Sequence, residues 1–258
     1  IQTIVDEMHF PGRIGIDKNW ASHFLLDLMK KLPDAKYINA SPCVDLVRMK
    51  KDLQEQVLMI ESSKINDAVM EEIIPFIQEG VTEKQLAKKL DELFFKHHST
   101  CYGAIVAFGK NAADPHHEND DTLLRKGDCV LIDMGCVYKG YCSDMTRTFF
   151  YEGILEEEIK AYEIVKKANE AAEAMIKPGV KLSDIDKCAR KVISDEGYGK
   201  YFTHRLGHFI GRDVHECGDV SSVNEMEVEE GMIFSIEPGI YLEGNFGVRV
   251  EDLVMVTK

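Results

Sequence analysis

Apolar residues recur three or four positions apart in several long segments of the chain. This spacing is typical of a helix that buries one face. It predicts a helix over about residues 21–32, which Pro33 ends, and two more over about 156–176 and 183–196. The chain therefore has helices both near its start and beyond its middle.

The longest helical pattern covers about residues 53–77. Its apolar stripe consists of Leu53, Val57, Ile60, Ala68, Val69 and Ile73. The next helix is predicted to begin at Thr82, because Thr82 and Gln85 match a capping box, in which each side chain satisfies an unpaired backbone N–H.

Shorter apolar runs bounded by polar residues predict strands. These runs cover about residues 35–40, 104–108, 129–134, 145–151, 232–236 and 247–256. Helices and strands follow one another in separate runs, which favours an α+β domain over a parallel βαβ sheet. The order helices–strands occurs twice, and Gly80-Val81 before one helix is similar to Gly179-Val180 before another, which hints at an internal duplication.

The pattern also predicts a domain boundary near residue 48. Residues 1–48 read as a small α/β piece with too little apolar surface to fold alone. Residues 49–258 contain the remaining helices and strands and form the main domain.

Composition and charge exclude several classes of function. The 258-residue chain has a net charge of −14, which argues against binding to nucleic acid or to an anionic membrane surface. No apolar run approaches the roughly 20 residues that span a bilayer. The seven cysteines are odd in number and include no Cys-x-x-Cys pair, so we expect reduced thiols in the cytoplasm rather than disulfides or structural zinc.

Two aspartates mark the ends of two predicted strands. Asp133 comes at the end of the apolar run 129–134, and Asp144 directly precedes the run 145–151. A hairpin that turned between Tyr138 and Lys139 would place the two carboxylates directly opposite each other. Two bare carboxylates so placed repel each other unless a proton or a metal ion lies between them. The alternative is two unrelated aspartates exposed at strand ends.

A second pair of acidic residues repeats this arrangement. Glu237 and Glu251 are centred on Gly244, inside a turn-forming cluster, so a hairpin would again bring two carboxylates face to face. Arg249 lies two residues before Glu251 and therefore on the same face of the strand. Two such pairs are much less expected by chance than one.

Histidine supplies the third element of the candidate site. Residues 203–216 contain three of the nine histidines, together with two glycines that allow close backbone approach. Four carboxylates and one imidazole suit Mn, Co, Fe or Zn in a two-metal centre. A water held between two such metals ionises near neutral pH, so this set predicts metal-assisted hydrolysis.

These motifs resemble the pita-bread metallopeptidases, the family of prolidase (Xaa-Pro dipeptidase), aminopeptidase P, methionine aminopeptidase and creatinase. The matching stretches are Asn-Ala-Ala-Asp-Pro-His-His at 111–117, Asp133-Met-Gly, 140–148, Gly207-His208, Val214-His215-Glu216, Glu237-Pro-Gly-Ile-Tyr241 and 247–252. The resemblance implies an α+β pita-bread fold with a curved antiparallel sheet, preceded by the last part of an α/β N-terminal domain.

The resemblance also implies the roles of individual residues. Two divalent ions, with Mn favoured and Co, Fe or Zn as the alternatives, would be held by Asp133, Asp144, His208, Glu237 and Glu251. Asp144 and Glu251 would bridge the two ions, and Glu237 would also act as the general base. The residues that would hold substrate or the developing oxyanion are His116 and His215, with His204 and Arg249 in supporting positions. His116 is chosen over His117 because it directly follows Pro115.

The implied activity is cleavage of Xaa-Pro bonds by a hydroxide that bridges the two metals. The complete set of five ligands argues against creatinase, which works without metal, and the short stretch from Glu237 to Glu251 argues against methionine aminopeptidase. Xaa-Pro dipeptidase is favoured, and aminopeptidase P and then a non-catalytic binding module on the same fold are the alternatives. The expected partners are a short Xaa-Pro peptide and a second copy of the chain in a homodimer, with neither nucleic acid nor membrane.

Overall fold

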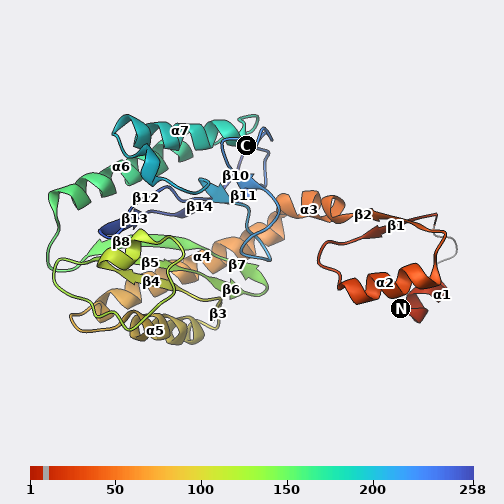
Figure 1. Ribbon diagram of the computed structural model, residues 1–258, viewed down its shortest axis with the longest axis horizontal. Coiled ribbons are helices and arrows are strands. Elements are labelled where there is room, and N and C mark those ends of the chain that lie inside the picture. The colour runs from red at the N-terminus through yellow and green to blue at the C-terminus, as the bar shows by residue number, and fades with distance from the viewer. Residues whose placement is uncertain (8–11) are drawn as a thin grey trace. The chain divides into compact units, whose positions relative to one another are not determined.

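The computed structural model describes residues 1–7 and 12–258 and divides into two compact units, Ile1–Arg48 and Met49–Lys258 (Figure 1). Residues 8–11, which fall inside the first predicted domain, lie outside the described residues. All seven cysteines are free thiols. Within the described ranges, no helix is long and apolar enough to cross a membrane.

The first unit is a small α/β arrangement around two parallel strands. Its elements are α1 (Gln2–Glu7), β1 (Arg13–Ile16), α2 (Ser22–Lys31), β2 (Lys36–Asn39) and the start of α3 (Ser41–Met49). β1 and β2 pair in parallel, with Ile14 opposite Tyr37. α2 and β2 confirm the helix and the strand that the sequence predicts here.

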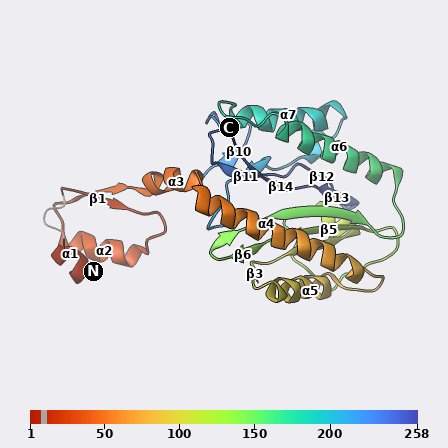
Figure 2. The same cartoon turned by 180° about the vertical axis from the view of Figure 1, so that it is seen from behind.

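The second unit places helices outside and antiparallel strands inside (Figures 1 and 2). Its helices are α4 (Leu53–Ile73), α5 (Glu83–Lys96), α6 (Glu156–Glu173) and α7 (Leu182–Asp195), with short 3-10 helices η1 (Ile74–Phe76), η2 (Gly109–Ala113) and η3 (Gly199–Tyr201). One hydrophobic cluster joins α4 and α5 to the strands nearest them, and a second joins α6 and α7 to the strands on their side. These features confirm the α+β prediction.

The strands form several small antiparallel sheets. They are β3 (Thr100–Cys101), β4 (Ile105–Phe108), β5 (Cys129–Met134), β6 (Cys136–Tyr138), β7 (Tyr141–Cys142), β8 (Met145–Phe150), β9 (Gly207–His208), β10 (Asp219–Val220), β11 (Ile233–Ile236), β12 (Gly239–Leu242), β13 (Phe246–Arg249) and β14 (Asp252–Met255). The pairings are β4–β5–β8, β3–β6–β7, β9–β10, β11–β14 and β12–β13. The predicted strand over 247–256 is therefore two strands, interrupted at residues 250–251.

The suggested internal duplication corresponds to a repeated turn. Gly80 has a φ of +85°, and its N–H donates to the Leu124 carbonyl at 2.9 Å. Gly179 has a φ of +89°, and its N–H donates to the Val228 carbonyl at 2.8 Å. In each case the residue after the glycine accepts a hydrogen bond back from the same partner, and a helix follows. A glycine fits both positions because residues with a side chain rarely adopt this left-handed backbone conformation.

The face of α4 that is buried differs from the predicted stripe. Leu53, Val57 and Ile60 are exposed, with Leu53 at 79%. The buried positions include Ser62, whose hydroxyl donates to the Tyr141 carbonyl, and Asn66, whose amide donates to the carbonyl of Met134. The first half of the predicted stripe is wrong, because the buried face of α4 runs through Met59, Ser62 and Asn66, and its middle packs against backbone carbonyls that accept from polar side chains.

Candidate metal centre

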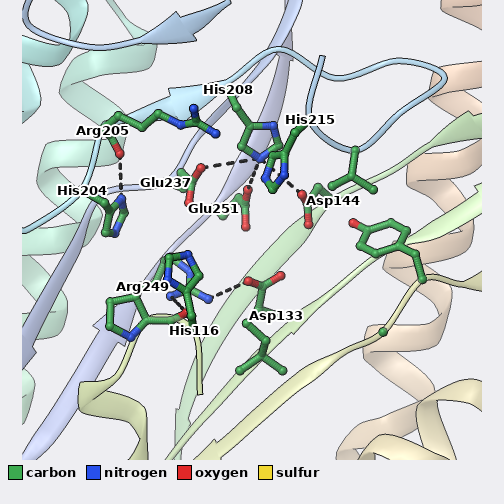
Figure 3. Close-up of a pocket in the computed structure, with 15 residues that line it drawn as sticks. His116, Asp133, Asp144, His204, Arg205, His208, His215, Glu237, Arg249 and Glu251 are labelled. Atoms are coloured by element: carbon green, nitrogen blue, oxygen red, sulfur yellow. Dashed lines mark hydrogen bonds and ion pairs between the residues drawn. The ribbon is translucent and has the colours of Figure 1, made fainter. Parts of the chain in front are cut away.

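Side chains from five strand ends meet in one cavity of the second unit, of about 670 Å³ (Figure 3). Asp133 is near the end of β5, Asp144 directly precedes β8 and His208 ends β9. Glu237 follows β11, and Glu251 lies between β13 and β14. The structure thus brings together all five residues that the sequence predicts as metal ligands.

Asp133 and Asp144 do not lie directly opposite each other, so that part of the prediction is wrong. Asp133 is paired with Thr146, and Asp144 is therefore its diagonal neighbour. The reason is the turn, where Lys139 and Gly140 both take positive φ, 49° and 84°. A two-residue turn of this kind is the favoured hairpin connection, and it shifts the centre of the hairpin one residue beyond the predicted place.

Glu237 and Glu251 keep the predicted register. The pairs on either side of them, Ile236 with Asp252 and Gly239 with Arg249, belong to the same alignment. Pro238 interrupts the ladder between them because it has no N–H to donate. The two glutamates therefore occupy facing positions at this interruption, which confirms the hairpin prediction for this pair.

His208 lies among three carboxylates. Its Nε2 is 3.5 Å from Asp144 Oδ2, 3.6 Å from Glu237 Oε1 and 4.0 Å from Glu251 Oε1. Its Nδ1 is 3.2 Å from the Phe209 carbonyl, which can only accept, so Nδ1 carries a hydrogen. The Nε2 atom is therefore the ring nitrogen that faces the carboxylates, as Figure 3 shows.

A serine on β11 aligns His208 with Glu237. The Ser235 hydroxyl accepts from the His208 backbone N–H at 3.0 Å and donates to Glu237 Oε1 at 3.2 Å. Position 207, directly before His208, requires a glycine, because a Cβ at Gly207 would lie 1.9 Å from the Ser235 carbonyl oxygen. The strands β9 and β11 can approach closely enough for this contact only because a glycine stands at 207.

Arg249 is the buried cation beside these carboxylates. Its Nη2 lies 2.6 Å from Asp133 Oδ2, and its Nη1 donates to the Tyr241 hydroxyl at 2.9 Å. Its Nε donates to the Thr146 hydroxyl, which in turn donates to Glu251 at 2.7 Å. Arg249 thus joins Asp133 directly, and Glu251 through one hydroxyl.

Burial, and to a lesser extent the crowding of acidic groups, raises the pKa values of three carboxylates in this cavity. Burial, opposed in part by Arg249, raises the pKa of Asp133 to about 6. Burial also raises the pKa of Glu237 to about 7 and that of Glu251 well above its ordinary value. For His208 burial lowers the pKa, but the nearby carboxylates outweigh burial and the pKa is raised. Each group therefore holds a proton more tightly than it would in the unfolded chain.

This arrangement predicts an unusual pH dependence for the metal-free protein. A group whose pKa is raised on folding stabilises the fold at low pH and loses that contribution as pH rises through its folded pKa. Asp133 and Glu237 ionise at about 6 and about 7, so both lower the free energy of unfolding as pH rises. His204, whose pKa burial lowers to about 4, acts in the opposite direction over part of this range. We expect a net fall on the order of 2 kcal/mol between about pH 4.5 and 7.5. Urea unfolding at a series of pH values measures this slope. An increase in stability over the same range would contradict the prediction, and saturating Mn²⁺ should flatten the slope by replacing the protons.

The donor set fits divalent cations. The ligand atoms of Asp144, His208 and Glu251 lie within 4.8 Å of one another, and all three side chains are buried. Carboxylate oxygens with one imidazole nitrogen suit first-row divalent metals. Cations would also balance the charge of these carboxylates, whose pKa values are raised mainly by burial and in part by mutual repulsion.

Three further histidines line the cavity, as predicted from the sequence: His116, His204 and His215. Burial lowers the pKa of His204 to about 4, and burial and the neighbouring His208 lower the pKa of His215. The His215 ring stands edge-on to His208, with centroids 4.3 Å apart. His117 instead turns away, and its Nε2 lies 2.7 Å from Glu83.

Several residues at the site received no role from the sequence, among them Tyr102 and Arg205 in the cavity lining and Tyr241 behind it. The Tyr241 hydroxyl lies 2.8 Å from His204 Nε2 and links it to Arg249. The Tyr102 hydroxyl donates to the Ser143 carbonyl at 2.7 Å. Tyr241 ends the motif stretch that begins at Glu237, so the sequence could have suggested it as a site residue. Nothing in the sequence near Tyr102 points to the site.

A family model and several solved structures place the chain in the same family of metallopeptidases. The model of metallopeptidase family M24 matches residues 57–258. A dipeptidase from Pyrococcus horikoshii OT3 is 40% identical, with a TM-score of 0.93 over 98% of this chain and 72% of that one. An Xaa-Pro dipeptidase from Bacillus anthracis is 33% identical, with a TM-score of 0.94 over 99% of this chain and 72% of that one. An X-Pro aminopeptidase from Thermotoga maritima MSB8 is 32% identical, with a TM-score of 0.91 over 99% of this chain and 73% of that one.

Proposed function

Since this chain belongs to metallopeptidase family M24, with the pita-bread fold of that family, we propose that it is a dinuclear Xaa-Pro dipeptidase. The observation that carries the proposal is the intact set of four carboxylates and one histidine that line a single cavity. The similarity to a dipeptidase and to an Xaa-Pro dipeptidase supports the substrate class.

The metal ligands in this proposal are Asp133, Asp144, His208, Glu237 and Glu251, and the favoured ion is Mn²⁺. Asp144 and Glu251 are proposed to serve both ions. When bound, two divalent ions polarise the carbonyl under attack and make a water acidic enough to react near neutral pH. Arg249 Nη2 donates to one oxygen of Asp133, which leaves the other oxygen of that carboxylate available to bind a metal ion.

Glu237 is proposed to move the proton during cleavage. Its pKa of about 7 suits a group that both accepts and donates near neutral pH. Its carboxylate takes a proton from the attacking water as the oxygen forms a bond to the carbonyl carbon. It then gives that proton to the proline nitrogen as the C–N bond breaks.

The histidines of the cavity are proposed to stabilise charge on the substrate. His116 and His215 line the cavity and can each donate an N–H to the carbonyl oxygen as it gains negative charge. His204 and Arg249 are joined through the Tyr241 hydroxyl, so they can orient the substrate as one unit.

The nature of the proline bond fits such a site. The proline amide nitrogen carries no hydrogen, so a peptidase that grips the scissile N–H lacks that contact. A site that binds the carbonyl oxygen and protonates the nitrogen from Glu237 does not need it. Cleavage before proline therefore depends on the groups that this cavity provides.

The proposal also covers the role of the first unit, residues 1–48, and the assembly of the chain into a homodimer. We infer that residues 1–48 form the last part of an N-terminal domain, and the chain spans about 72% of the dipeptidase chains that it matches. The predicted homodimer and the cytoplasmic location remain predictions. Sedimentation of the purified protein would test the first of these.

Hydrolysis of two matched peptides tests the function. We expect the Mn-loaded protein to release free proline from an Xaa-Pro dipeptide faster than it cleaves an Xaa-Pro-Yaa tripeptide, and a chelator should abolish both reactions. Preference for the tripeptide would instead identify aminopeptidase P, the second candidate. Protein that binds two metals and cleaves neither peptide would refute the proposal and favour a binding module.

A further inference from the structure

A fully buried carboxylate lies outside the candidate metal ligands and is surrounded by hydrogen-bond donors. Glu83 is the first residue of α5 and has 0% exposure. Its Oε1 accepts from the Phe108 backbone N–H and from the Asn111 side-chain amide, both at 2.9 Å. Its Oε2 accepts from His117 Nε2 at 2.7 Å and from the Asp120 backbone N–H at 3.0 Å.

These contacts exclude a metal site at Glu83. Glu83, His117 and Asp120 offer ligand atoms within 4.8 Å of one another, as a metal site would. However, a carboxylate has about four lone-pair positions, and four N–H groups occupy them here. A cation would have to displace these donors, so the cluster is a hydrogen-bonded anchor.

All four donors belong to one segment, residues 108–120. They come from both of its ends, and the middle of the segment carries Pro115 and His116, which line the catalytic cavity. A second contact fixes the same segment, since a Cβ at Gly247 on β13 would lie 1.8 Å from the Ala112 carbonyl oxygen. The position of His116 in the cavity therefore depends on an anchor outside the cavity.

The helix after the second glycine turn uses a comparable arrangement. Asp186 on α7 is fully buried and binds Arg190 through two contacts of 3.0 Å. Arg190 donates to the carbonyls of Phe202 and His204, at 3.1 and 2.9 Å. A buried carboxylate on the helix after each repeated glycine turn thus holds a loop that brings a histidine to the cavity.

We propose that Glu83 is a positioning residue that acts through His116, a role that rests on the proposed function of this site. Its four hydrogen bonds hold residues 108–120 so that the His116 imidazole faces the substrate carbonyl. Loss of this anchor would displace His116 without touching the metal ligands. Displacement of about 1 Å at a reacting group can cost about 100-fold in rate.

A double-mutant cycle tests this assignment. Glu83→Gln replaces one acceptor oxygen with an NH2 group, which cannot accept. Whichever way the amide is turned, the backbone N–H of Phe108 or that of Asp120 loses its acceptor. We expect kcat/KM to fall by about 10- to 100-fold, mainly in kcat, with unchanged Mn²⁺ affinity by calorimetry. In the His116→Ala background, the same change should cost less than about 2-fold, because the group that Glu83 positions is already absent. An equal loss in both backgrounds, or no loss in the parent, would overturn the proposal.

Matched variants separate positioning from general damage. Glu158→Gln alters another buried glutamate, which caps α6 through the Leu155 N–H, and should leave activity near that of the parent. If Glu83→Gln fails to fold, His117→Ala removes one of the four hydrogen bonds at a side chain that is 13% exposed, and its loss should also vanish in the His116→Ala background. In the Glu158→Gln background, by contrast, the effect of Glu83→Gln should be fully additive.

Hydrogen exchange distinguishes failure of this proposal from failure of the proposed function. If the parent protein cleaves no Xaa-Pro peptide, the proposed function is refuted, but the anchor can still be tested. Glu83→Gln should then accelerate amide exchange in residues 108–120 and not in the segment around Glu158. Unchanged exchange in residues 108–120 would overturn the anchoring role as well.

Discussion

Asp144→Asn is expected to remove nearly all peptidase activity while leaving the metal-free fold nearly as stable as the parent. In the proposed site Asp144 serves both ions, so its neutral analogue should weaken metal binding and lower kcat by about 10³-fold or more. In the metal-free protein Asp144 raises the pKa of Glu251 by repulsion and that of His208 by attraction. Its removal loses both effects, which oppose each other, so the free energy of unfolding near neutral pH should stay within about 1 kcal/mol of the parent.

Three measurements on one variant check this prediction: Mn²⁺ titration by calorimetry, hydrolysis of an Xaa-Pro dipeptide, and urea unfolding in chelator. Asp195→Asn removes the same charge from the exposed end of α7, where Asp195 pairs with Lys191, and should change none of the three appreciably. Full Mn-dependent activity in Asp144→Asn would refute the bridging role. A variant that is inactive and also strongly destabilised in chelator would point to a structural role instead.

The hairpins show how far the sequence alone could predict the site. Glu237 and Glu251 could be aligned because their turn is centred on a glycine and the strands keep one register through both ladders. Asp133 and Asp144 were misaligned because the left-handed φ of Lys139 is unusual for a residue with a side chain. A shift of one residue in the centre of a turn changes the paired residue by two positions. Asp133 and Asp144 therefore still lie on the same face of the sheet, but they are not directly opposite each other.

The errors in α4 have a different origin. Apolar spacing cannot reveal that Ser62 and Asn66 are buried, because their partners are backbone carbonyls of Tyr141 and Met134, far along the chain. Those partners exist only once the strands are in place. Leu53 and Val57 match the helical period equally well, yet they are exposed. Periodicity therefore locates the helix but does not decide which face is buried.

The anchor at Glu83 was also invisible in the sequence. An acidic residue just after the Thr82 cap is favourable at any helix start, so it gives no hint of a longer-range role. Only the fold shows that residues 108–120 return to this helix end and saturate the carboxylate. A residue that positions a catalytic group is harder to predict than a metal ligand. A glutamate at a helix start is common in any sequence, and only the folded structure shows which segment it contacts.

Arg249→Met is expected to be the most destabilising single change at the site in the metal-free protein. Arg249 is 2% exposed, and its loss leaves the Asp133 carboxylate without the guanidinium 2.6 Å away and removes the donors to Tyr241 and Thr146. Breaking a buried ion pair from one side costs about 3–5 kcal/mol. We expect a loss of that size in the free energy of unfolding at about pH 8, measured by urea titration in chelator.

Two conditions should reduce this loss, and they identify its cause. At about pH 5 Asp133, with its pKa of about 6, is protonated, so the variant leaves no bare charge and the cost should fall by about half. Saturating Mn²⁺ should reduce the cost in the same way if Asp133 is a ligand, because the cations then balance its charge. A cost that is the same at both pH values and with Mn²⁺ would mean that Arg249 acts through packing. Relief by protons but not by Mn²⁺ would remove Asp133 from the set of ligands while preserving its ion pair with Arg249.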